Sequence, residues 1–116
     1  MVATLLRMAR TARWGLATVR GRSMLPTLRE GDRLLVRYGA PVRPGLVVLA
    51  RFPDGVLAVK RVERADRHFS GADAWLLASD NRTEPGARRA PVRTDAVLGV
   101  VRLRAWPRPR CLVRHI

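Results

Sequence analysis

The sequence predicts a single, mainly β domain that is small, antiparallel and partly closed. Short runs rich in Val and Leu recur along the chain, and turn-forming stretches such as Pro44-Gly45 and Pro53-Asp54-Gly55 separate them. Strands spaced so closely favour antiparallel pairing in a sheet that curls on itself, without buried helices. The length of 116 residues fits one modest hydrophobic core.

The first segment, residues 1–13, is basic. Arg7, Arg10 and Arg13 recur at helical spacing and interrupt any apolar core of a signal peptide. We therefore expect either a short amphipathic helix, which would suit an anionic membrane surface, or a solvated terminus.

The β domain itself is predicted to span residues 14–105, and its first strand, residues 14–20, leads the chain to Ser23. Further strands are predicted at residues 33–38, 46–52, 56–63, 74–78 and 97–104. Residues 106–116 form a basic tail. Pro107 and Pro109 interrupt strand pairing there, so we expect the tail to run irregularly over the surface.

The charge balance bounds the partners. The chain carries 23 Lys and Arg residues against 9 Asp and Glu, a formal net charge of +14, which favours anionic partners. The basic residues are scattered, and no zinc-finger or ribonucleoprotein-like motif accompanies them, so we expect no nucleic-acid partner.

The cysteine count and the hydropathy of the chain exclude further classes of protein. Cys111 is the one cysteine, which excludes an intramolecular disulfide and a cysteine metal cluster. We expect no metal and no cofactor. No apolar run reaches the roughly 18–20 residues needed to span a bilayer, so we expect a cytoplasmic protein, with peripheral contact at the membrane as an alternative.

Lys60 is the single lysine among the 23 basic residues. Arginine stays protonated in proteins, whereas a desolvated lysine can lose its proton and act as a general base. Strand alternation places Lys60 on one face with Val56, Ala58 and Val62, and that apolar surrounding would lower its pKa. Two simpler explanations stay open: coding bias toward arginine, and an edge-strand lysine that reaches water.

Ser23 is the candidate nucleophile. Gly21 permits a sharp bend before it and Pro26 fixes the path after it, which would expose the hydroxyl and aim backbone N–H groups at an oxyanion. A serine in such a bend could equally serve only to hydrogen-bond the turn. With Lys60 as base, the pair would form a Ser/Lys dyad.

Six blocks, in order, resemble the signal peptidase I and LexA-type Ser/Lys peptidases. The blocks are residues 21–28, 31–36, 44–45, 59–62, 79–81 and 97–99. The resemblance implies a β domain of the signal peptidase and LexA C-terminal type, in which Ser23 attacks the scissile carbonyl and neutral Lys60 takes its proton.

The same resemblance implies supporting roles. Met24 would shape the site beside the nucleophile, and Asp32, Asp80 and Asn81 would order the turns near the dyad. Arg61 would pair with a carboxylate such as Asp80 instead of touching substrate.

The chain departs from the family pattern at two places. Many signal peptidases have a Ser or Thr oxyanion donor where this chain has Gly21, so backbone N–H groups, mainly that of Ser23, would have to serve. The Ser-x-Asp-Ser-Arg segment that usually follows Asn81 is missing, so the hydroxyl that orients Lys60 would come from Ser79 or Thr83.

Within the family, the chain most resembles the short, unanchored branch described as nickel-type superoxide dismutase maturation proteases. This implies a serine endopeptidase that removes an N-terminal extension from a precursor protein. Two alternatives stay open: signal-peptide processing at the membrane surface, and a noncatalytic basic binding module on the same fold.

Overall fold

The computed structural model describes residues 2–6, 13–83 and 89–113 of the chain. Nine strands and one 3-10 turn make up its regular structure. They are β1 Val2–Leu6, β2 Trp14–Arg20, β3 Arg33–Tyr38, β4 Val47–Arg51, β5 Leu57–Arg67, β6 Asp73–Ala78, β7 Ala90–Arg93, the 3-10 turn Thr94–Ala96, β8 Val97–Trp106 and β9 Arg110–Cys111. No helix in this described part is long and apolar enough to cross a membrane.

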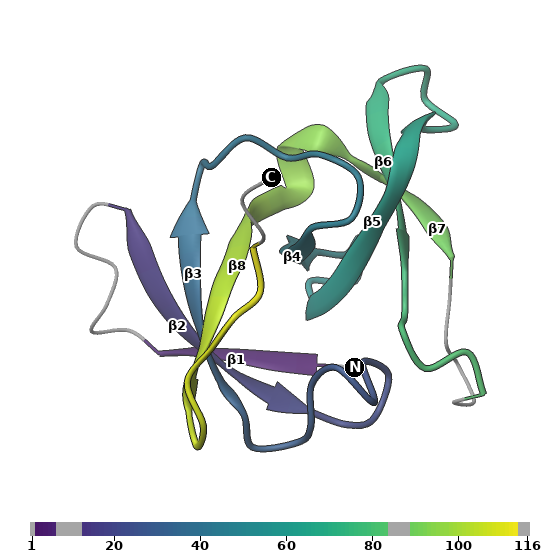
Figure 1. Cartoon of the computed structure of the whole chain (residues 1–116). Helices are drawn as coiled ribbons and strands as arrows, with labels where there is room; N and C mark the ends of the chain where they lie inside the picture. The colour runs from purple at the N-terminus through teal and green to yellow at the C-terminus, as the bar shows by residue number, and fades with distance from the viewer. Residues whose placement is uncertain (1, 7–12, 84–88, 114–116) are drawn as a thin grey trace.

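All nine strands belong to one sheet in the order β1-β2-β3-β8-β4-β5-β6-β7, with β9 added on β8. Every pairing is antiparallel. The late strand β8 inserts between β3 and β4 and joins the two halves of the sheet, and β1 also lies close to β5, so the sheet curls back on itself (Figure 1). The predicted mainly β, antiparallel and partly closed fold is confirmed.

The core forms two clusters on the curved sheet. One contains buried side chains of β2 to β5 and β8, together with Met24 and Leu28 from the loop after β2. The other gathers around Val48, Leu77 and Val100. Met24 and Leu28 are fully buried, and burial of each such side chain is worth about 1.5–3 kcal/mol. The loop that carries Ser23 is therefore anchored on both sides of its proline.

Most predicted strands match the observed ones closely. The predicted strands at residues 14–20 and 33–38 coincide with β2 and β3. β5 continues past the predicted end to Arg67, and its register shifts between Val62 and Arg64, as a β-bulge does. The short strand β7 was not predicted because Pro91 argues against a strand; β7 lies at the edge of the sheet, where a missing N–H is tolerated.

The helix expected near the N-terminus is wrong for Val2–Leu6. These residues form β1, paired with β2 from Val2 opposite Arg20 to Leu6 opposite Leu16. The edge of β2 offers backbone groups that need partners, and this tertiary demand overrides the helical spacing of the arginines. Arg7 and Arg10, which carried the helical pattern, lie outside the described residues.

The C-terminal tail is also more regular than expected. Trp106 still belongs to β8, and Arg110–Cys111 return as β9 beside it. The Leu112 N–H donates to the Arg102 carbonyl at 2.9 Å, and Val113 is buried. The two prolines therefore form a turn back onto β8 instead of releasing the chain; residues 114–116 lie outside the described range.

Candidate active site

Ser23 lies in the loop that follows β2. Gly21, two residues earlier, has φ of +87°, a conformation that only glycine adopts readily. The Ser23 side chain is almost fully buried, and its Oγ makes no hydrogen bond with any described residue. Its backbone carbonyl accepts a 2.8 Å hydrogen bond from the Asn81 N–H. The expectation that the bend exposes the hydroxyl is therefore wrong: Met24 and Leu28 draw the loop into the core, and the Ser23 hydroxyl is buried with it.

Lys60 lies in the buried half of β5. The residue is 5% exposed, and its Nζ donates a 2.6 Å hydrogen bond to the Oγ of Ser79, which is also buried. β5 pairs with β4 on one side and β6 on the other, with Lys60 opposite Val48. The explanation of an edge-strand lysine that reaches water is therefore wrong.

Residues 79–81, which follow β6, connect the serine loop to the lysine. Ser79 accepts the hydrogen bond from Lys60, and the Asn81 N–H donates to the Ser23 carbonyl. Between them, the Asp80 N–H points to the sulfur of Met24 at 3.4 Å. One three-residue segment therefore contacts both members of the suspected dyad.

The Asp80 carboxylate accepts three hydrogen bonds from described residues. Arg61 donates from Nε at 3.1 Å and from Nη2 at 2.7 Å, and the Thr27 hydroxyl donates at 2.6 Å. Burial alone would raise the pKa of the Asp80 carboxyl, but the hydrogen bonds from Arg61 and Thr27 and the charges of Arg61 and Arg82 outweigh it and hold the pKa below its ordinary value. The ionised Asp80 side chain thus joins Thr27 of the serine loop to Arg61 of β5, and we call these three residues the Asp80 clasp.

All three nitrogens of the Arg61 guanidinium donate hydrogen bonds within the protein. Besides its two bonds to Asp80, its Nη1 donates to the Gly45 carbonyl at 2.9 Å. The pairing of Arg61 with Asp80 is the one expected for it. Thr27 lies in the same sequence block as Ser23, and the sequence assigns it no role. Its contact with Asp80, 53 residues away, could not be predicted from its position in the chain.

The two hydroxyls considered for orienting Lys60 are placed differently. Ser79 bonds Lys60 directly, whereas the Thr83 hydroxyl donates to the Asn81 side chain at 2.8 Å. The Asn81 amide in turn donates to the Arg22 carbonyl at 3.1 Å. Thr83 therefore supports the serine loop indirectly, through Asn81. Ser79 carries the hydroxyl that is hydrogen-bonded to the Lys60 amine.

Asp32 and Pro26 sit at the margins of this arrangement. Buried Asp32 accepts from the Arg29 N–H at 2.9 Å and faces Arg104 at 3.5 Å. These contacts close the far end of the serine loop and do not involve Ser23 or Lys60. Pro26 is exposed and lies between buried Met24 and the Thr27 contact to Asp80.

The described residues contain no group of His, Cys, Asp and Glu side chains that could hold a metal ion. The functional groups that this site does assemble are an unengaged buried hydroxyl, a buried amine bonded to a second hydroxyl, and a clasped carboxylate. The hydroxyl and the amine are the two groups that proton transfer from a serine to a lysine uses.

Comparison with known proteins gives a family for the chain. Searches of curated proteins and of solved structures found no match. The family model described as Peptidase S24-like matches residues 4–102, which include the serine loop, β5 and the segment after β6. Because the match covers most of the chain, the protein belongs to the Peptidase S24-like family, the LexA and signal peptidase type of Ser/Lys peptidases.

Proposed function

We propose that this chain is a serine endopeptidase in which Ser23 is the nucleophile and Lys60 the general base. The observation that carries the proposal is the double contact of residues 79–81, which bond the Lys60 amine through Ser79 and the Ser23 backbone through Asn81. Membership of a family of serine peptidases supports the reaction class.

In the first step Lys60, as the neutral amine, takes the proton of the Ser23 hydroxyl while Oγ attacks the scissile carbonyl carbon. The peptide C–N bond then breaks, the Lys60 ammonium returns the proton to the leaving amine, and an acyl-enzyme remains. Water, deprotonated by the same amine, hydrolyses the ester and restores Ser23. Burial of Lys60 favours its neutral form, and the Ser79 hydroxyl fixes the direction of the amine.

The oxyanion of this reaction needs donors. Among the hydrogen bonds of the described residues none uses the Ser23 N–H, which is therefore available to a substrate carbonyl. Gly21 brings no side-chain hydroxyl, and its positive φ sets the path of the loop into Ser23. We assign the oxyanion contact to the Ser23 backbone.

As substrate we propose a precursor protein with a cleavable N-terminal extension. The narrower candidate, a precursor of nickel-type superoxide dismutase, is supported by sequence resemblance alone. Processing of signal peptides at an anionic membrane is the second candidate, and the net charge of +14 supports it.

The test compares new protein N-termini in host cells that carry the native chain, Ser23→Ala or Lys60→Arg at equal abundance. Ser70→Ala is the matched control, because Ser70 is an exposed serine in the turn between β5 and β6. We expect one small set of N-termini to disappear in both dyad variants and persist in the control, and those peptides identify the substrate. Coinciding profiles in all four strains would reject the peptidase and favour a binding module on this fold.

A further inference from the structure

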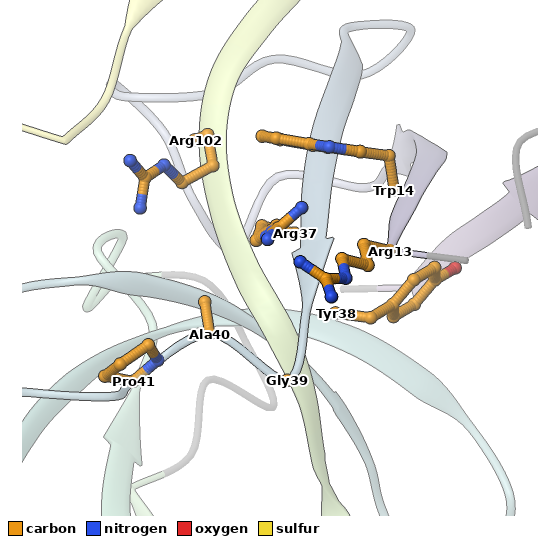
Figure 2. Close-up of a pocket in the computed structure, with 8 residues that line it drawn as sticks. All are labelled: Arg13, Trp14, Arg37, Tyr38, Gly39, Ala40, Pro41 and Arg102. Atoms are coloured by element: carbon orange, nitrogen blue, oxygen red, sulfur yellow. The ribbon is translucent and has the colours of Figure 1, made fainter. Parts of the chain in front are cut away.

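A second concave site lies at the opposite end of β2 from Ser23. Its pocket of about 600 Å³ is bounded by Arg13, Trp14, Arg37, Tyr38, Gly39, Ala40, Pro41 and Arg102 (Figure 2). Trp14 begins β2 and Ser23 follows its end, so a strand of roughly 20 Å separates the two places. The pocket is therefore not part of the dyad, and the proposed peptidase reaction does not use it.

The described residues leave this pocket cationic. Arg13, Arg37 and Arg102 line it, and no carboxylate of the described residues does. None of these three arginines forms an ion pair with an Asp or Glu of the described residues, whereas seven other arginines do so elsewhere on the molecule. Arg37 and Arg102 are partly buried and line the same pocket, so an anion bound between them would reduce the repulsion between their like charges.

The walls of the pocket are set by strand register. Trp14 and Arg37 are direct partners in the β2–β3 ladder, and the Arg37 guanidinium lies 5.0 Å from the centroid of the Trp14 ring. Figure 2 shows Arg37 beneath the edge-on Trp14 ring, with Arg13 to one side and Arg102 to the other. The Tyr38 N–H donates to the Arg13 carbonyl at 2.7 Å, which ties the residue before β2 to the end of β3.

Gly15 completes this wall. A Cβ at Gly15 would come within 2.3 Å of the Tyr38 hydroxyl oxygen, so the Tyr38 ring packs directly on the bare backbone of β2. A second basic pocket, of about 370 Å³, is lined by Arg43, Arg61 and Arg110, of which Arg61 is bonded to Asp80 and Gly45. No aromatic residue is among its described lining residues. Of these two pockets, the Arg37 pocket is the one that combines unpaired guanidinium groups with an aromatic face.

We propose that this pocket binds a phosphate ester. Guanidinium groups match phosphate oxygens in paired, charge-assisted hydrogen bonds. The hollow has the size of a small-molecule site, and Trp14, 38% exposed, adds a ring on which a nucleobase can stack. The phosphate ester can belong to a soluble mononucleotide or to a phospholipid headgroup, which offer the same chemistry to the arginines.

The test titrates the purified full chain with adenosine monophosphate and, separately, with vesicles of phosphatidylglycerol in phosphatidylcholine at fixed ionic strength. Arg37→Gln and Arg102→Gln should each weaken binding roughly tenfold or more. The matched control is Arg33→Gln. Arg33 also lies on β3, 5.0 Å over a tryptophan ring, that of Trp106, and carries the same charge, but it does not line the pocket.

Each outcome decides the proposal. Saturable binding of adenosine monophosphate that depends on Arg37 and not on Arg33 supports it with a soluble ligand. The same dependence seen with vesicles only supports it with a lipid headgroup as the source. Equal losses in the Arg33 and Arg37 variants would show diffuse electrostatic attraction and overturn the pocket, as would the lack of saturable binding to both probes.

Discussion

Lys60 donates a 2.6 Å hydrogen bond to Ser79, and both side chains are buried. A lysine whose only role was to keep the surface of a strand charged and hydrated would direct its amine to water. Here the amine donates to the Ser79 hydroxyl, on the segment whose next two residues contact Met24 and Ser23. The arrangement determines where the amine lies relative to the serine loop, and the first two predictions test its chemical and positional parts.

Replacing the base should abolish cleavage without unfolding the protein. Lys60→Arg keeps a long basic side chain, but arginine stays protonated and cannot accept the Ser23 proton. Lys60→Met keeps the apolar stem and removes the amine. We expect both variants to lose roughly 10²-fold to 10⁴-fold in turnover of a precursor substrate, with circular dichroism close to that of the native chain. A folded Lys60→Arg protein with activity within a few-fold of native would remove Lys60 as the base.

Ser79 is a positioning residue for Lys60, and Ser79→Ala should lower turnover by about tenfold. Its oxygen accepts a hydrogen bond that favours the ammonium, so without it the rise of the rate with pH should move to lower pH. Ser79→Thr should restore both properties. Thr83→Ala is the control, because the Thr83 hydroxyl bonds Asn81 and not Lys60; a pH profile unchanged in Ser79→Ala would mean that Ser79 is only structural.

The sequence predicts those strands in which apolar and polar residues alternate in step with buried and exposed side chains. In β2, Ala17 and Val19 are buried while Thr18 between them is only partly so, and this apolar-polar-apolar alternation is visible in the chain itself. β1 and β9 carry no such signal. β1 pairs with the free edge of β2, and β9 pairs with the part of β8 that extends past its pairing with β4. Such edges are created by residues distant in sequence, so a local pattern does not predict them.

The same limit applies to the site. Residue type and sequence neighbours are enough to predict roles for Gly21, Ser23 and Lys60, and the blocks that contain them resemble a known family. The contacts that connect these blocks span long stretches of sequence, as between Thr27 and Asp80 or Asn81 and Arg22. The choice of Ser79 over Thr83 at the amine depends on where β6 ends against β5, which only the fold decides.

The Asp80 clasp should make stability depend on pH. Its carboxyl has a folded pKa below the ordinary value, so its contribution is complete above the unfolded pKa and is lost as pH falls through the folded pKa. Asp80→Asn should destabilise the native chain by about 1–3 kcal/mol at neutral pH, and it should flatten the loss of stability that begins below about pH 5 and continues through the folded pKa. Denaturant unfolding across that range measures both effects.

The control for the clasp is Asp95→Asn. Asp95 also pairs with an arginine, Arg93 at 2.8 Å, but its side chain is 66% exposed. The loss should therefore stay below about 1 kcal/mol. Equal losses in the two variants would show that the Asp80 contacts contribute no more than a surface pair.

Gly99 should be the glycine least able to accept a side chain. It lies in β8, and a Cβ there would come within 2.6 Å of the Arg37 carbonyl oxygen and 2.8 Å of Val36 Cγ1. The first of these atoms is backbone of the paired strand β3, so relief requires the strands to separate. Gly99→Ala should cost about 1–3 kcal/mol or more. Gly55→Ala, in open space at φ of +85°, should cost about 1 kcal/mol through backbone strain alone. If thermal unfolding ranked Gly55→Ala as the more damaging change, the close approach of β3 and β8 at this point would be disproved, because steric overlap acts at Gly99 and only backbone strain acts at Gly55.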